Sequence, residues 1–162
     1  MSGDSRSAAV LVASTRAAAG VYTDRSAPVI SAWLAAHGFA VGEPVIVPDG
    51  EPVGAALRRL LGEKPAVIIT TGGTGLSPDD ATPEMTEPLL DRQIPGIMEA
   101  IRAAGRMKTP HAALSRGHAG TAGRTFIINL PGSPGGVADA LEVLDPIIGH
   151  LCEQIEGGHG HA

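Results

Sequence analysis

Residues 66–84 combine the residue types that bind anions and metal ions. An apolar, β-branched run (66–71) leads directly into the glycine-rich segment 72–75, and two adjacent carboxylates, Asp79 and Asp80, follow it. Glycines let backbone N–H groups approach an anion closely because no side chain stands in the way. The sequence therefore predicts a buried strand that delivers exposed backbone amides and a carboxylate to the edge of a sheet.

The glycine-rich segment differs from the two common phosphate-binding motifs. No lysine follows its last glycine, which excludes a P-loop, and Pro78 stands where a dinucleotide-binding fingerprint needs its third glycine. A tight strand-to-helix turn without a ligand is the alternative interpretation. Such a turn needs only one or two special residues, so the run of small residues here favours an anion site. These residues are Gly72, Gly73, Thr74, Gly75 and Ser77.

The two carboxylates after this segment have two explanations. Acidic residues before a Thr-Pro helix start are favoured by the helix dipole by about 0.3–1 kcal/mol. Beside an anion-binding loop, however, a carboxylate is electrostatically unfavourable unless it holds a cation. Mg²⁺ is bound in many proteins through one or two carboxylates together with substrate phosphates. We therefore expect Asp80 to hold Mg²⁺, with Asp49 as a second ligand; capping of the following helix is the alternative role for Asp49.

The other predicted strands also end in polar or glycine-rich residues. Ligands of open α/β sheets bind at the carboxyl ends of the strands, so these ends predict one polar rim. Ser133 begins the last helix and is expected to cap it, and phosphates also bind readily at such helix starts. Arg116 offers a bidentate phosphate contact, and Arg16 and Arg25 are weaker candidates. The predicted binding residues are Ser14, Gly72, Gly73, Thr74, Gly75, Ser77, Ser115, Arg116, Pro131, Gly132 and Ser133.

Strands and helices are predicted to alternate along the chain. Continuous apolar runs indicate strands that are buried on both faces, and their alternation with helices predicts a three-layer α/β/α domain with a mostly parallel sheet. Thr82 is expected to cap the helix after the glycine-rich segment. We expect one domain at 8–156, between a flexible N-terminus (1–7) and a Gly/His tail (157–162). The predicted strands are 8–13, 39–47, 66–71, 111–114 and 125–130, and the predicted helices begin near residues 26, 52, 82, 94 and 133.

Composition excludes several classes of function. The net charge is −5 with no basic block, which argues against nucleic-acid binding. No apolar run approaches the roughly 20 residues that span a bilayer, so a cytoplasmic protein is expected. The single cysteine, Cys152, excludes an internal disulfide and lies in an apolar stripe, which predicts a buried thiol. No histidine pair has zinc-site spacing.

Several ordered motifs along nearly the whole chain resemble the MogA/MoaB molybdopterin-binding family of molybdenum cofactor biosynthesis, which includes a domain of animal gephyrin. The resemblance implies the molybdopterin-binding fold of that family. It also implies adenylyl transfer from Mg-ATP to molybdopterin, with release of pyrophosphate. Asp49 and Asp80 match the two functionally critical aspartates of the family. The motifs are residues 20–24, 47–49, 71–75, 80–84, 95–96, 114–116 and 128–134.

The resemblance implies partners as well as substrates. Members of this family form trimers and in some cases hexamers, so a homo-oligomer is expected, with a molybdenum insertase as a partner. Two positions depart from the family pattern. Asp79 stands where members commonly carry arginine, and Thr15 stands where many have aspartate. A non-catalytic molybdopterin carrier or scaffold, and an unrelated phosphate-binding α/β enzyme, are the alternative functions.

Overall fold

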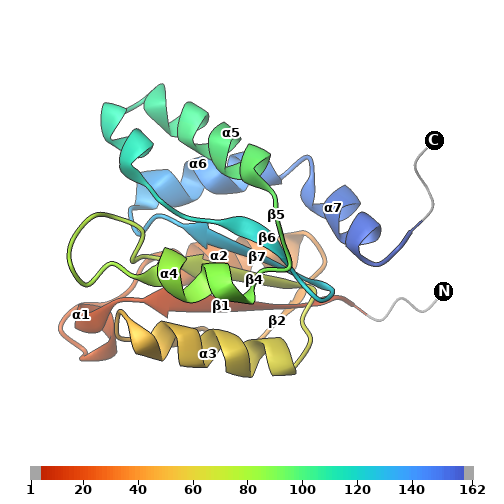
Figure 1. Cartoon of the computed structure of the whole chain (residues 1–162), viewed down its shortest axis with the longest axis horizontal. Coiled ribbons are helices and arrows are strands. Elements are labelled where there is room, and N and C mark those ends of the chain that lie inside the picture. Colours follow the sequence, from red (N-terminus) through yellow and green to blue (C-terminus); the bar gives the residue numbers. More distant parts are fainter. Residues whose placement is uncertain (1–4, 159–162) are drawn as a thin grey trace.

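The central feature of the fold is one mixed sheet. In the computed structural model, which describes residues 5–158, seven strands pair in the order β2-β1-β4-β7-β6-β5, with β3 also beside β1 (Figure 1). Strands β1 to β4 and β7 are parallel, whereas β6 is antiparallel to both of its neighbours. The strands are β1 (Ser7–Ala13), β2 (Ala40–Val41), β3 (Val45–Val47), β4 (Val67–Thr71), β5 (Arg92–Gln93), β6 (Ala119–Ala122) and β7 (Thr125–Leu130).

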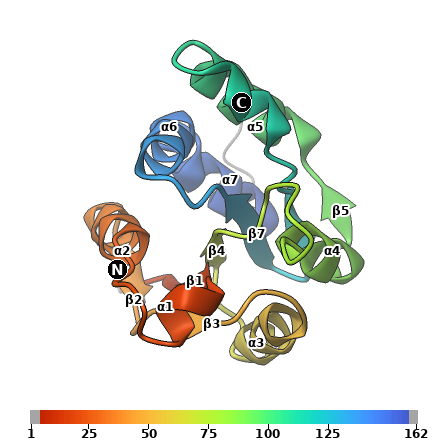
Figure 2. The same cartoon turned by 90° about the vertical axis from the view of Figure 1, so that its left-hand side faces the viewer.

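Helices cover both faces of this sheet. Helices α2, α5, α6 and α7 pack on one face, and α3 and α4 pack on the other (Figure 2). No helix within residues 5–158 combines the length and apolar character needed to cross a membrane. The helices are α1 (Thr15–Ala18), α2 (Ser26–Ala36), α3 (Glu51–Gly62), α4 (Thr82–Thr86), α5 (Pro95–Arg106), α6 (Pro134–Leu144) and α7 (Ile148–Ile155), with 3-10 turns η1 (Glu87–Leu89) and η2 (Pro110–Leu114).

The three-layer arrangement follows from the alternation of side chains along the strands. In β1, Val10 and Val12 face the cluster beneath α2 and α6, while Leu11 and Ala13 face the cluster beneath α3. The same alternation runs through β4 and β7, every residue of which is buried. The predicted fold class is therefore confirmed. The buried thiol is confirmed too: Cys152 of α7 is buried, and burial raises its pKa to about 11.

Two predicted strands are wrong. The predicted strand 39–47 is broken into β2 and β3, because Pro44 lies between them and has no N–H to donate to a ladder. The predicted strand 111–114 is the 3-10 turn η2. Pro110 sets a turn-forming φ there, and the Thr109 side chain accepts a hydrogen bond from the N–H of His111. Consequently Ser115 and Arg116 follow a turn and not a strand.

Strands β5 and β6 were not predicted, because their sequence carries no apolar β-branched run. Strand β6 reads Ala-Gly-Thr-Ala, and it is held by a tight turn to β7 in which Gly123 has φ +59°. A Cβ on Gly120 would collide with the carbonyl oxygen of Arg92, so β5 approaches β6 only because this residue is glycine. Small residues thus form an edge of the sheet that hydrophobic periodicity does not reveal.

An ion pair joins the segment before β1 to the end of α7. Arg6 accepts a backbone hydrogen bond from Ala40 N, and its guanidinium pairs with Glu156 at 2.7 Å. Gly157 and Gly158 form a turn after α7, where Gly158 N donates to the carbonyl oxygen of Glu153. Of the expected flexible segments, residues 1–4 and 159–162 lie outside the described residues.

A buried amide ties the sheet to α4. Asn129 of β7 has no exposed surface, and its Nδ2 donates to the hydroxyl oxygens of Thr70 and Thr86, each at 3.0 Å. Its Oδ1 accepts from the N–H of His118 at 2.9 Å. Thr86 in turn donates to the carbonyl oxygen of Thr82. Every polar atom of the Asn129 side chain therefore has a partner, and those partners come from β4, α4 and the segment before β6.

Replacing Asn129 by leucine, which keeps the branched shape but carries no polar atoms, tests this arrangement. The N–H of His118 would then be buried without a partner, so we expect the free energy of unfolding to fall by about 1–3 kcal/mol in urea denaturation. Thr70→Val removes a single acceptor and serves as the control, with a loss of about 1 kcal/mol. An Asn129→Leu variant as stable as the parent would show that the amide does not hold the sheet to α4.

Candidate functional site

Four parallel strands end at one edge of the sheet. The register pairs Ala13 of β1 with Val47 of β3, and Thr71 of β4 with Leu130 of β7. Backbone bonds continue past these ends, since Ser14 N donates to Val47 O at 2.9 Å and Gly72 N donates to Leu130 O at 3.0 Å. Figure 2 looks onto this edge of the molecule. The structure thus brings together the segments that follow β1, β3, β4 and β7, as the strand ends predicted.

The glycine loop (residues 72–80) packs directly on its neighbours. Gly72 and Gly73 have φ of +95° and +69°, a region that strains residues with side chains. A Cβ on Gly72 would collide with the carbonyl oxygen of Ala13, and one on Gly73 would collide with the Thr82 hydroxyl. That same Cβ would lie 3.1 Å from Oδ1 of Asp49. Backbone conformation and lack of space both require glycine at these two positions.

Asp49 reaches across to α1 and does not cap α3. Its Oδ2 accepts from the N–H and the hydroxyl of Thr15, each at 3.1 Å, and its own N–H donates to that hydroxyl oxygen. Gly50 is the N-cap of α3, and no side chain caps that helix. Within the described residues, Oδ1 of Asp49 makes no hydrogen bond. Asp49 therefore presents one carboxylate oxygen toward Gly73 at the start of the loop.

Asp80 closes the other end of the loop. Its N–H donates to Ser77 O at 2.9 Å, and its Oδ2 accepts from Ser77 N at 3.1 Å. A Cβ on Gly75 would lie only 2.8 Å from that same Oδ2. Asp79, in contrast, is exposed. The two adjacent carboxylates thus occupy different environments: Asp80 is turned against the loop, and Asp79 is exposed to solvent.

Thr82 does not cap α4 as predicted. Helix α4 begins at Thr82, its N-cap position is Ala81, and no side chain makes a capping bond there. The N–H of Thr82 instead donates to Gly73 O at 3.1 Å, which ties the helix to the loop. The Thr82 hydroxyl is buried and finds no partner among the described residues. The side chain therefore packs beneath the loop and leaves the first turn of α4 uncapped.

Arg116 hydrogen-bonds to the backbone of the glycine loop. Its Nε donates to Gly75 O and its Nη2 to Asp80 O, both at 2.9 Å, while its backbone N–H donates to Thr74 O at 3.0 Å. Its Nη1 bonds to Glu84 of α4 at 2.7 Å. The hydrogen bond from Arg116 holds the pKa of Glu84 below its ordinary value, and the carboxylate raises the pKa of Arg116. In this structure the guanidinium therefore hydrogen-bonds to the loop carbonyl oxygens and to Glu84.

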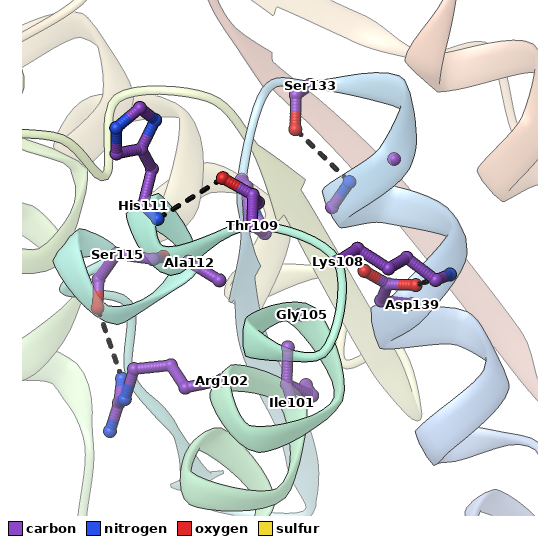
Figure 3. Close-up of a pocket in the computed structure, with 13 residues that line it drawn as sticks. Ile101, Arg102, Gly105, Lys108, Thr109, His111, Ala112, Ser115, Ser133 and Asp139 are labelled. Atoms are coloured by element: carbon purple, nitrogen blue, oxygen red, sulfur yellow. Dashed lines mark hydrogen bonds and ion pairs between the residues drawn. The ribbon is translucent and has the colours of Figure 1, made fainter.

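Two cavities lie on either side of the turn formed by residues 131–133. The smaller, of about 130 Å³, is lined by Ser14, Gly72 and Gly132 and also by Tyr22 and Asp24. The larger, of about 350 Å³, lies between α5, η2 and α6 (Figure 3). Six of the predicted binding residues therefore line one cavity or the other, whereas Gly73, Thr74, Gly75, Ser77 and Arg116 line neither.

Some residues around the larger cavity were predicted and others were not. Ser133 caps α6, because its Oγ accepts from Gly136 N at 3.1 Å, and Ser115 Oγ donates to the Thr74 hydroxyl at 3.3 Å. Arg102, Lys108 and Asp139 were missed. Lys108 pairs with Asp139, whose side chain is only 8% exposed. The sequence carried no local signal for Asp139, because it lies two residues after Val137 and so is off the helix face that Val137, Leu141 and Leu144 share.

Among residues 5–158, no group of three or more His, Cys, Asp or Glu residues gathers to hold a metal ion. The oxygens that border the glycine loop are carboxylates and hydroxyls, which suit a hard cation such as Mg²⁺. With Asp49 at one end of the loop and Asp80 at the other, such an ion would need further oxygen ligands from a bound phosphate or from water. The residues present therefore fit a magnesium–phosphate pair better than a metal ion alone.

The Arg116–Glu84 pair predicts a pH dependence of stability. Because the pKa of Glu84 is lowered in the folded state, the stabilisation is present above the ordinary carboxyl pKa and is lost as the pH falls through the lowered value. The Glu84 side chain is 55% exposed, so we expect an effect of at most about 1 kcal/mol. Urea unfolding at pH 7 and pH 3 should therefore differ less for Glu84→Gln than for the parent. Glu51→Gln, which removes an exposed pair with Arg58, is the control.

The sequence matches characterised proteins over most of its length. A family described as "Probable molybdopterin binding domain" matches residues 9–150. The molybdenum cofactor biosynthesis bifunctional protein of Chlorobaculum tepidum is 41% identical over 156 residues, and the match covers 95% of this chain. That match covers 49% of the relative, so the chain spans about half its length. The molybdopterin adenylyltransferase of Helicobacter pylori is 33% identical over 154 residues, with 93% of this chain and 88% of that protein covered.

The fold matches solved structures as well. The Molybdopterin biosynthesis Mog protein from Mycobacterium ulcerans superposes with a TM-score of 0.89 at 53% identity, and the match covers 93% of this chain and 99% of that one. Family, sequence relatives and fold thus agree over the same residues. The chain belongs to the MogA/MoaB family of molybdopterin-binding proteins.

Proposed function

We propose that this protein transfers the adenylyl group of ATP to molybdopterin in molybdenum cofactor biosynthesis. The observation that carries the proposal is the edge where four strands end. There, the glycine loop, the carboxylates of Asp49 and Asp80, and two cavities lie together. The name of the relative from Helicobacter pylori, molybdopterin adenylyltransferase, supports this assignment.

In the proposed reaction the protein positions the two substrates and forms no covalent bond with either. A terminal phosphate oxygen of molybdopterin attacks the α-phosphorus of ATP, a new P–O bond forms, and the bond to the β-phosphate oxygen breaks as pyrophosphate leaves. Holding two anions in line for attack supplies much of the acceleration. Backbone N–H groups of the glycine loop are suited to stabilise the charge that develops on the phosphorus oxygens.

Asp49 and Asp80 are the residues that would hold Mg²⁺. The ion, when bound, neutralises phosphate charge and polarises the phosphorus centre. The carboxylates themselves are kept at fixed ends of the loop: Thr15 orients Asp49, and the turn at Ser77 orients Asp80. Arg116 acts as a positioning residue for the loop, because its guanidinium bonds to Gly75 O and Asp80 O.

A non-catalytic molybdopterin carrier is the second candidate function. The exposed Asp79 favours it, since this residue places a negative charge on the glycine loop at a position where the family resemblance leads us to expect arginine. A carrier should bind molybdopterin but show no magnesium-dependent binding of ATP in isothermal titration. The trimeric or hexameric assembly, the cytoplasmic location and the molybdenum insertase partner stay predictions, which sedimentation, fractionation and pull-down measurements can test.

Asp80→Asn is the main test of the proposed function. Asparagine can still accept the hydrogen bond from Ser77 N, so the loop should keep its shape while the charge is lost. We expect molybdopterin binding to be retained and formation of adenylyl-molybdopterin from Mg-ATP to fall on the order of 100-fold. The product is measured by chromatography and pyrophosphate release by a coupled assay.

Asp79→Asn is the matched control, because it removes the neighbouring charge from an exposed side chain. It should transfer adenylyl at least as fast as the parent. Equal turnover of Asp80→Asn and the parent would remove Asp80 from the mechanism. A parent protein that binds molybdopterin, but neither binds Mg-ATP nor forms product, would support the carrier.

A further inference from the structure

The Thr82 hydroxyl is buried without a hydrogen-bond partner. Thr82 has no exposed surface, and its Oγ1 contacts neither a donor nor an acceptor within hydrogen-bonding geometry in the described part of the chain. Buried hydroxyls nearly always have a partner, since an unmet one lowers stability. The ligand-free structure therefore does not explain why the Thr82 hydroxyl is buried without a partner.

The rest of Thr82 is held in place. Its N–H donates to Gly73 O at 3.1 Å, and its carbonyl oxygen accepts from the hydroxyl of Thr86 at 2.8 Å. The Thr86 oxygen is itself bonded by Asn129 of β7. The backbone of Thr82 is thus tied both to the glycine loop and to the buried network, so its side chain stays directed against the loop.

The hydroxyl lies close to a second unpartnered oxygen. One point, the place where Gly73 would carry a Cβ, lies in collision distance of Thr82 Oγ1 and 3.1 Å from Oδ1 of Asp49. Because Gly73 has no Cβ, nothing of its own side chain separates the hydroxyl from the carboxylate. Asp49 uses Oδ2 for Thr15 and leaves Oδ1 on the side of Gly73. A donor without an acceptor and an acceptor without a donor therefore flank the same glycine.

We propose that Thr82 is a positioning residue for the adenylyl transfer: its hydroxyl donates to Oδ1 of Asp49 when the site holds its phosphate ligand. This inference rests on the proposed function. A hydroxyl donor fixes the orientation of the carboxylate without neutralising its charge, so Asp49 keeps its attraction for a cation. In the ligand-free protein the bond is not formed, and the hydroxyl lowers stability there.

Thr82→Val and Thr82→Ser separate this role from packing. Valine keeps the β-branched shape and removes the hydroxyl, whereas serine keeps the hydroxyl. We expect ligand-free Thr82→Val to unfold at a higher temperature than the parent. We also expect kcat for adenylyl transfer to fall at least about 10-fold in that variant, the effect of one lost hydrogen bond to a charged group. Thr82→Ser should retain most of the activity of the parent.

Two further variants test whether the effect is specific to Thr82 and whether it acts through Asp49. Ser31 of α2 carries the other unpartnered buried hydroxyl of the described residues and lies outside the site, so Ser31→Ala should raise stability and leave kcat unchanged. If Thr82 acts through Asp49, the double variant Thr82→Val with Asp49→Asn should be no slower than Asp49→Asn alone.

The outcomes distinguish this inference from the proposed function. If the parent forms adenylyl-molybdopterin and Thr82→Val has the kcat of the parent, or if the effects of Thr82→Val and Asp49→Asn simply add, the role of Thr82 is refuted and the function stands. If the parent itself forms no product, the proposed function fails and the role of Thr82 fails with it. A slower but more stable Thr82→Val, rescued by serine, supports both.

Discussion

The candidate site depends on one buried side-chain amide. Asn129 joins β7 to β4 through Thr70 and to α4 through Thr86, with no polar atom of its side chain left unpaired. Helix α4 is only five residues long and has no side-chain cap, so its placement comes from these contacts and from packing. Because α4 carries both Thr82 and Glu84, the amide also determines where the glycine loop is held.

Two sets of hydrogen bonds connect α4 to the glycine loop. Thr82 N–H binds Gly73 O at the start of the loop, while Glu84 holds Arg116, which binds Asp80 O at its end. Arg116, which the sequence suggested as a phosphate contact, therefore supports the loop instead. Two carboxylates then border a loop that we propose binds phosphate, and the guanidinium of Arg116 is already paired, which is electrostatically consistent with a cation between protein and phosphate.

How far the sequence predicted this site varies from residue to residue. The positions of Gly72 and Asp80 at the edge of the sheet were predicted because their signals are local: a strand running into glycines, and a carboxylate before a helix. Asn129 was not recognised as a structural residue, because an asparagine in an apolar strand has no local signature of three distant partners. Asp139 was missed for the same reason, since its partner Lys108 lies on a different segment. Strand β6 was missed because small residues carry no periodic pattern.

Local sequence patterns predicted the layers of the fold and the edge of the sheet at which we propose that ligands bind, because apolar periodicity and parallel connections follow from neighbouring residues. The roles of the polar side chains at that edge follow from the tertiary structure alone. Arg116 became a support for the loop, Asp49 turned toward Thr15, and the Thr82 hydroxyl was left beneath Gly73 without a partner. The physical reason is that a hydrogen bond depends on distances of about 3 Å between groups far apart in the chain, and packing alone sets those distances.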